Sequence, residues 1–254
     1  MFFNSSVPTV HPLLFKGFEN KKDLTSSFIV KQLEEKEIDE AAQCIAEAFS
    51  SREMITTNFR IEKDSLYEGV KKDLQKALEA NLCLVCIDKK TNKLAGVVYY
   101  EDLKEVLDPK VWQENMLKDE KWGKLEEFYS YLFSIISPYA CPKDRNDVLL
   151  FKKLAVAQEF VRLGVASNLI FAGRYLHPRI TKAKRRLMIA SNQKTYNFCK
   201  KNGWELIKEI DVNDYNLMPN KQGSFSGNGV VYLMKYEPKE GKSLISEIKS
   251  FFEN

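Results

Sequence analysis

One stretch in the second half of the chain, from Leu154 to Ile170, constrains the fold more than any other part of the sequence. It begins with the apolar residues of a buried strand, passes through a turn of small residues, and continues with the spacing of an amphipathic helix. Gly164 and Ala166 carry little or no side chain where that helix begins. We therefore predict bare backbone N–H groups from about Arg162 to Ala166, at the positive end of the helix dipole, where a pyrophosphate can bind.

The composition is that of a globular protein with an ample core, and it argues against several classes of function. Hydrophobic residues make up 44% of the 254 residues and charged residues 29%. The net charge of +4 is too small to indicate nucleic-acid binding. No apolar stretch reaches the length of a transmembrane helix. With two histidines in the chain, we expect no histidine-based metal or catalytic site.

The five cysteines lack the spacing of a disulfide framework, which indicates reduced thiols in an intracellular protein. Cys83 and Cys86 form a CxxC inside an apolar run, where a strand would point them to opposite faces. We therefore predict two buried cysteines rather than a redox or zinc pair. The cytoplasm is the expected compartment. The mitochondrion is an alternative that Glu19, Asp23 and the lack of arginine in residues 1–27 disfavour.

Hydrophobic periodicity predicts one α/β (α+β) domain at residues 28–237. The expected strands are 28–33, 82–88, 94–102, 148–157, 186–190, 204–212 and 229–236. The expected helices are 35–49, 63–80, 165–175 and 193–202, the last of them ended by Gly203 in a left-handed cap. The aromatic-rich segment 103–147 is interpreted as a helical insertion. Residues 1–27 are predicted to form an N-terminal arm and residues 238–254 an amphipathic helix, and either could contact a protein partner.

Two nucleotide-binding motifs do not fit the turn. A Rossmann fingerprint needs Gly-x-Gly-x-x-Gly after the first strand and an acidic residue about 20 positions later. The turn of this chain lies late in the sequence and lacks those glycines. A Walker A motif needs a Gly-Lys-(Ser/Thr) that does not occur here.

The order of the elements and two motifs resemble the GNAT superfamily of acyl-CoA-dependent N-acetyltransferases. The phosphate loop of that family, (Gln/Arg)-x-x-Gly-x-(Gly/Ala), corresponds to Val161-Arg-Leu-Gly164-Val-Ala166. Its segment Asn-x-x-Ala-x-x-(Leu/Phe)-Tyr-x-x-x-Gly-Phe lines up with Asn192, Thr195, Phe198, Cys199, Gly203 and Trp204. The resemblance implies a GNAT fold: a mixed, mostly antiparallel sheet of six to seven strands, helices on both faces, and a helical insertion between strands 3 and 4.

The resemblance also implies acetyl-CoA as the cofactor, with the thioester carbonyl facing the N–H of Val156 or a neighbour. The implied cofactor-binding residues are Leu154, Ala155, Val156, Val161, Arg162, Leu163, Gly164, Val165, Ala166, Ser167 and Asn192. Val161 replaces the Gln or Arg of the family, so we expect a weaker but intact pyrophosphate site. Cys199 replaces the tyrosine that commonly protonates the CoA thiolate. Cys199 and Tyr196 are the candidates for this acid, and a packing role is the alternative for each.

The stretch Phe49-Ser-Ser-Arg-Glu53-Met-Ile-Thr56 resembles the Phe-x-x-x-Glu-Pro-(Leu/Met)-Thr segment of the arylalkylamine and dopamine N-acetyltransferase branch. This implies that Glu53 is the general base, and a surface glutamate is the alternative. The insertion would shape the amine pocket through Tyr129, Tyr131 and Phe133.

The predicted function is therefore acetyl transfer from acetyl-CoA to a small primary amine, directly and within a ternary complex. The alternative is a catalytically silent GNAT-fold subunit that docks onto partners through its arm, tail and insertion.

Overall fold

The computed structural model describes residues 27–108, 120–139, 148–180, 183, 185–217 and 229–237. The predicted N-terminal arm (apart from Ser27), the predicted C-terminal helix and parts of the predicted insertion lie outside the described residues. The bounds of the domain therefore stay a prediction.

Seven strands form one sheet in the order β1-β2-β3-β4-β5-β7-β6. The strands are β1 (Phe28–Gln32), β2 (Cys83–Asp88), β3 (Leu94–Asp102), β4 (Val148–Val156), β5 (Arg185–Ala190), β6 (Glu205–Asp211) and β7 (Val230–Tyr236). All neighbouring strands are antiparallel except β4 and β5, which are parallel. The predicted mixed, mostly antiparallel sheet is confirmed.

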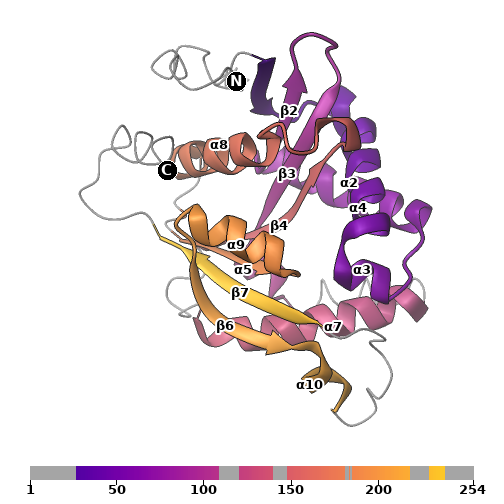
Figure 1. The fold of residues 1–254 in the computed structure, drawn as a ribbon, viewed down its shortest axis with the longest axis vertical. Helices are drawn as coiled ribbons and strands as arrows, with labels where there is room; N and C mark the ends of the chain where they lie inside the picture. Colours follow the sequence, from indigo (N-terminus) through magenta and orange to yellow (C-terminus); the bar gives the residue numbers. More distant parts are fainter. Residues whose placement is uncertain are drawn as a thin grey trace, which may run out of the picture.

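Helices cover both faces of this sheet (Figure 1). The α-helices are α2 (Ile38–Arg52), α3 (Met54–Asn58), α4 (Lys63–Glu79), α5 (Leu103–Val106), α7 (Glu120–Ile136), α8 (Val165–Ile180), α9 (Gln193–Lys201) and α10 (Val212–Asn216). Short 3-10 helices are η2 (Glu35–Glu37), η3 (Ser137–Tyr139) and η5 (Gln158–Phe160). None of the helices in the described part of the chain is long and apolar enough to cross a membrane.

Strand β2 and most of β3 are buried on both faces, which explains the uninterrupted apolar sequence of β2. Helices α2 and α4 pack Ile45 and Leu74 against one face, and α8 packs Leu169 against the other. Cys83 belongs to the core under α2 and α4, whereas Cys86 belongs to the core under α8. The prediction that these two cysteines are buried on opposite faces is confirmed.

The insertion between β3 and β4 contributes α5 and α7 to the fold. Phe128 and Leu132 of α7 pack against Ile55 of α3 and Tyr215 of α10, and Phe133 packs under β4 and β5. The helices α3 and α10 were not expected from the sequence, because five residues are too few to show a helical period.

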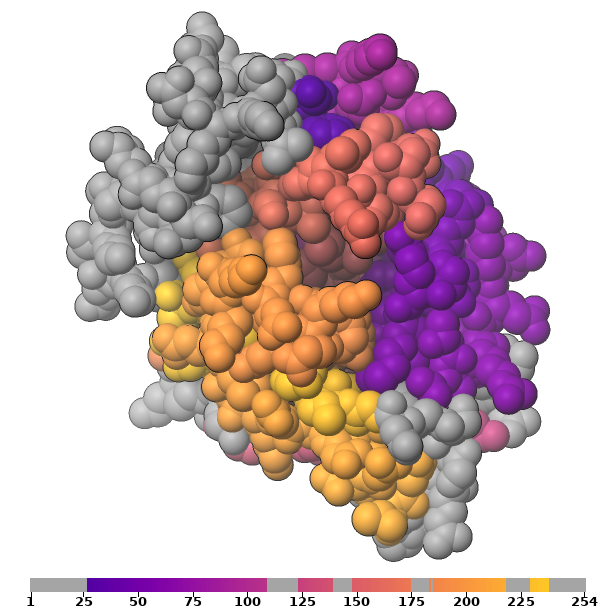
Figure 2. All heavy atoms as spheres, in the orientation of Figure 1, coloured from indigo at the N-terminus to yellow at the C-terminus, as the bar shows by residue number. Residues whose placement is uncertain are grey.

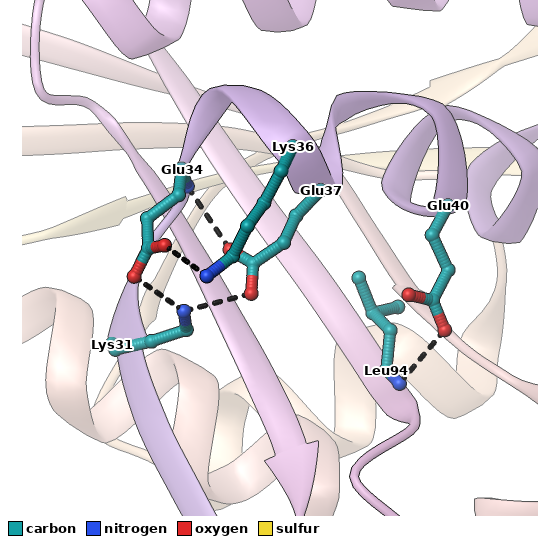
Figure 3. A network of polar contacts seen from close by, with 6 residues as sticks. All are labelled: Lys31, Glu34, Lys36, Glu37, Glu40 and Leu94. Carbon is teal, nitrogen blue, oxygen red and sulfur yellow. Dashed lines mark hydrogen bonds and ion pairs between the residues drawn. The ribbon is translucent and has the colours of Figure 1, made fainter.

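The N-terminus of α2 is fixed to the sheet by a network of charged side chains (Figure 3). The Lys31 ammonium lies 2.6 Å from a Glu34 carboxylate oxygen and 2.7 Å from one of Glu37. Lys36 pairs with the other oxygen of Glu34 at 2.7 Å. The N–H of Leu94 donates to Glu40 at 3.0 Å and links α2 to β3.

Gly173 allows α8 to lie directly on Tyr100 of β3. A Cβ at position 173 would overlap the Tyr100 hydroxyl. We expect Gly173→Ala to lower the free energy of unfolding by about 1–2 kcal/mol, because overpacking outweighs the ~1 kcal/mol of helix propensity gained. Urea denaturation measures this change. In a Tyr100→Phe background the cost should shrink, and a stabilised Gly173→Ala single variant would contradict the packing described.

Glu34 should make stability depend on pH in the acid range. Its hydrogen bonds to Lys31 and Lys36 lower the pKa of Glu34 from 4.5 to about 2. A carboxylate with a lowered pKa stabilises the fold above its unfolded pKa, and this contribution disappears as the pH falls toward 2. Glu34→Gln should therefore cost less than about 1 kcal/mol at pH 7, since the side chain is half exposed, and nothing at pH 2. Urea denaturation of both proteins between pH 7 and pH 2 measures this. The difference between their free energies of unfolding should shrink as the pH falls, rather than stay constant.

Candidate functional site

The two parallel strands at the centre of the sheet diverge after a short contact. Residues Val148–Phe151 of β4 pair with Arg185–Met188 of β5, and the pairing ends there. On its other edge β4 stays paired with β3 as far as Val156. In Figure 1, α9 and β7 lie on one side of this divergence, and α2 and α3 lie on the other. The second half of β4 therefore has one edge without a neighbouring strand.

The backbone groups of Leu154 and Val156 point to this open edge. The N–H of Ala157 donates to the carbonyl of Ala95 at 3.0 Å and so points toward β3. Because backbone groups alternate in direction along an antiparallel ladder, those of Val156 and Leu154 point the other way. The Val156 carbonyl indeed accepts a hydrogen bond from Arg52 Nη2 at 3.1 Å. Both Leu154 and Val156 thus place an N–H where the sequence predicts the strand amide.

The turn that follows β4 has the backbone of an anion-binding loop. Arg162 and Gly164 have left-handed φ angles of 70° and 78°. Alternation of left- and right-handed backbone turns successive N–H groups inward, and α8 begins at Val165. Among the hydrogen bonds of the described residues, none uses the N–H groups of Arg162, Gly164, Val165, Ala166 or Ser167.

The prediction of an uninterrupted row of bare N–H groups was wrong at one residue. The N–H of Leu163 donates to the carbonyl of Phe160 at 3.3 Å, because η5 tightens the chain before the turn. The side chains of Val161 and Leu163 are exposed. The side chain of Val161 offers no polar group to an anion, as the sequence indicated.

Gly96 is a residue of this site that the sequence analysis missed. It lies opposite Val156 on β3, and a Cβ there would come within 2.7 Å of Val165 Cγ1 and 2.8 Å of the Ala155 carbonyl. The glycine therefore allows the first turn of α8 to approach the sheet beside the turn. Its signal was a glycine inside an otherwise apolar strand, a common mark of close backbone approach.

The segment after β5 closes the other side of the divergence. Asn192 caps α9, because its side-chain oxygen accepts the N–H of Thr195 at 2.9 Å. Tyr196, one turn later, is half-buried and stacks on Tyr232 of β7 with ring centroids 4.5 Å apart. Cys199 lies in the core with its thiol against Met188, and burial raises the pKa of Cys199 to about 12. Of the two predicted acids, only Tyr196 is partly accessible.

Glu53 lies where α2 ends and α3 begins. Its carboxylate caps α3 by accepting the N–H groups of Ile55 at 3.1 Å and Thr56 at 2.7 Å. The preceding Arg52 reaches across to the Val156 carbonyl and to Gln158. This bridge brings the α2–α3 junction to the end of β4. The surface of the molecule is hollowed where α8, α9 and the α2–α3 segment meet (Figure 2).

One of the three predicted pocket aromatics reaches this junction. Burial, followed by the charges of Glu53 and Glu126, raises the pKa of Tyr129 well above its ordinary value. The Lys153 ammonium lies 5.9 Å from the centroid of the Tyr129 ring and 5.4 Å from that of Phe49.

Of the other two predicted aromatics, Phe133 stacks on Tyr129 with ring centroids 6.1 Å apart, whereas Tyr131 contacts α10. Tyr131 packs on Tyr215, with ring centroids 5.3 Å apart. Phe133 lies under Lys152, whose ammonium is 5.9 Å from the centroid of its ring.

In the part of the chain that the structure describes, no three or more His, Cys, Asp or Glu residues gather in a way that could hold a metal ion.

No family model and no curated protein sequence matches this chain. Solved structures do. The arylalkylamine N-acetyltransferase 2 of Aedes aegypti has a TM-score of 0.67 and 15% identity over 83% of this chain and 98% of its own. The polyamine N-acetyltransferase of Drosophila melanogaster has a TM-score of 0.67 and 13% identity over 83% and 100%. The C-terminal condensation domain of Ebony, in complex with beta-alanyl-dopamine, has a TM-score of 0.68 and 14% identity over 83% and 99%.

These likenesses span 98–100% of the compared proteins, and at identities of 13–15% they show the fold alone. The chain has the fold of the GNAT acetyltransferases.

Proposed function

We propose that this protein is an N-acetyltransferase that uses acetyl-CoA and acetylates a small primary amine directly, within a ternary complex. One observation carries the proposal: the open edge of β4 runs directly into a turn whose N–H groups are available. This arrangement fits a nucleotide with a long arm that contains amides: the arm can pair with the open edge of β4, and the phosphates can bind the N–H groups of the turn. The likeness to N-acetyltransferases of arylalkylamines and polyamines supports an amine as the acceptor.

The residues of the turn fit the pyrophosphate of CoA. Five backbone N–H groups at the start of a long helix supply donors and the positive end of the dipole. Arg162 adds a charge beside them, whereas Val161 adds none. The amides of Leu154 and Val156 would bind the arm of the cofactor and the thioester carbonyl.

Bound acetyl-CoA supplies an acetyl group that is activated as a thioester with a thiol leaving group. Glu53 would accept, directly or through water, the proton that an ammonium loses before it can react. Its carboxylate keeps lone pairs for this purpose, since each oxygen accepts a single backbone N–H. Tyr196 is the better candidate for the acid, because the Cys199 thiol lies in the core.

Direct transfer is supported by the state of the cysteines. Cys44, Cys83, Cys86 and Cys199 are all buried, and burial raises the pKa of each thiol. No described cysteine is therefore suited to form an acyl-enzyme, which requires an accessible thiolate. Four free thiols also agree with the reducing cytoplasm as the proposed compartment.

Binding of acetyl-CoA should raise the thermal stability of the protein. At about 100 times its Kd, a ligand that binds only the folded state adds about 2.7 kcal/mol, or roughly 5 °C or more in Tm. Gly164→Ala should weaken this binding about tenfold or more, because an alanine resists the left-handed angle that arranges the donors. Calorimetry with acetyl-CoA measures both effects.

Gly203→Ala is the matched control for this experiment. Gly203 also has a left-handed φ, 76°, but it ends α9 and lies away from the turn. Its replacement should lower stability about as much as Gly164→Ala and leave the Kd for acetyl-CoA unchanged. A protein whose Tm does not respond to saturating acetyl-CoA would refute the proposed function.

The role of Glu53 as a base can be separated from its role as a helix cap. Serine is a favoured N-cap but carries no base, so Glu53→Ser should keep Tm nearly unchanged. We expect kcat/KM to fall about 10²–10⁴-fold. The assay measures the release of free CoA thiol with a primary amine that the unsubstituted protein acetylates. The loss should shrink as the pH approaches the pKa of the amine, which then needs no base. Equal kinetics in both proteins would remove Glu53 from the mechanism.

A further inference from the structure

The two lysines of β4 stand next to the open edge and lie on the same side of the sheet. The register with β3 shifts at this point: Tyr99 pairs with Lys153 and Tyr100 with Phe151, so Lys152 is the extra residue of a β-bulge. Lys152 pairs with Glu101 at 2.9 Å. Lys153 has no hydrogen bond or ion pair to any other described residue, and its ammonium lies between the rings of Phe49 and Tyr129.

The charges that face Lys153 are already engaged elsewhere. On α4, Asp73 accepts the Tyr99 hydroxyl at 2.8 Å. On β3, Glu101 holds Lys152.

The remaining acid near Lys153 is Glu126 of α7. Burial raises the pKa of Glu126, whereas the charges of Lys152 and Lys153 act to lower it. Burial, followed by the charge of Lys152, lowers the pKa of Lys153, in spite of the three carboxylates of Asp73, Glu101 and Glu126. In the described part of the chain, Lys153 thus has no carboxylate paired with it.

This arrangement restricts the acceptors that can enter beside Leu154. Phe49 and Tyr129 are the rings that would attract the ammonium of a substrate, but the protein's own ammonium lies over both. A second ammonium, as in a diamine or polyamine, would meet a like charge in a partly buried place. A carboxylate would instead supply the partner that Lys153 lacks.

We propose that Lys153 determines the charge of the acceptor: the amine acetylated here carries a carboxylate, which Lys153 binds, and amines with a second positive charge are rejected. This inference rests on the proposed function, because it assigns the acceptor of the same site. Lys153 acts as a specificity-determining residue and takes no part in moving protons.

The test compares ligands that differ only in one carboxylate. In each conjugate, the sulfur of CoA is joined through an acetyl bridge to the nitrogen of an amine. One pair compares the conjugates of tyrosine and tyramine. The other pair compares the conjugates of 4-aminobutyrate and butylamine. Calorimetry should show the carboxylate conjugate of each pair binding about tenfold more tightly than its partner. Lys153→Met should abolish this ratio, and Lys153→Arg should keep most of it.

Lys71→Met is the matched control. Lys71 also lies over a tyrosine ring, that of Tyr67 at 5.7 Å, but it belongs to α4 and pairs with Asp39 of α2 at 2.6 Å. The Lys71→Met variant should leave the ratio of the two affinities in each pair unchanged. Ratios near one, or a preference for the uncharged conjugates in the unsubstituted protein, would overturn the assignment of Lys153 whatever the stability of the variants.

The affinity for CoA alone separates the two proposals. Tight CoA binding with no carboxylate preference would reject the role of Lys153 and leave the acetyltransferase proposal standing. Failure of the protein to bind CoA would reject both.

Discussion

The β-bulge at Lys152 is the local feature on which the arrangement of the site depends. A bulge adds one residue to a strand, bends it and increases its twist. Here it occurs directly after Phe151, the last residue of β4 that pairs with β5. A bend at that point turns β4 away from β5 while its ladder with β3 continues to Val156. The same irregularity brings two consecutive lysines to one face, so the open edge and the charge beside it have one cause.

The position of the turn at the end of β4 depends on the close packing of α8 against β3. Gly96 allows the first turn of α8 to lie against β3, and Gly173 does the same for a later turn. With α8 fixed in this way, the chain must reverse between Ala157 and Val165, and Arg162 takes a left-handed angle that costs a non-glycine residue about 1 kcal/mol. Strain of this kind persists where the surroundings impose it, and it arranges the N–H groups that the proposed cofactor would use.

The sequence predicted what its periodicity and small residues determine directly. All seven strands, the helices α2, α4, α8 and α9, the left-handed Gly203 and the opposed cysteines agree with the structure. The bulge, the left-handed Arg162 and the bonded N–H of Leu163 could not be predicted, because they result from pairing and packing with distant residues. The place of Lys153 was missed for the same reason: in the sequence it is one lysine of a pair, and only the register with β3 decides where it points.

The proposed site has a donor side, built from backbone groups, and an acceptor side, built from side chains. The two sides differ in how many residue types each position can accept. The donor side is made of backbone N–H groups and the absence of side chains, so Val161 and an exposed Leu163 are tolerated there without loss of the main donors. The acceptor side is made of side chains from α2, β4 and α7, and each of them can change the ligand that fits. Such a division allows a fold to be shared at 13–15% identity while its acceptor differs. If Lys153 sets the charge of the acceptor as we propose, the acceptor is encoded by residues such as Lys153, Phe49 and Tyr129, which come together only in three dimensions.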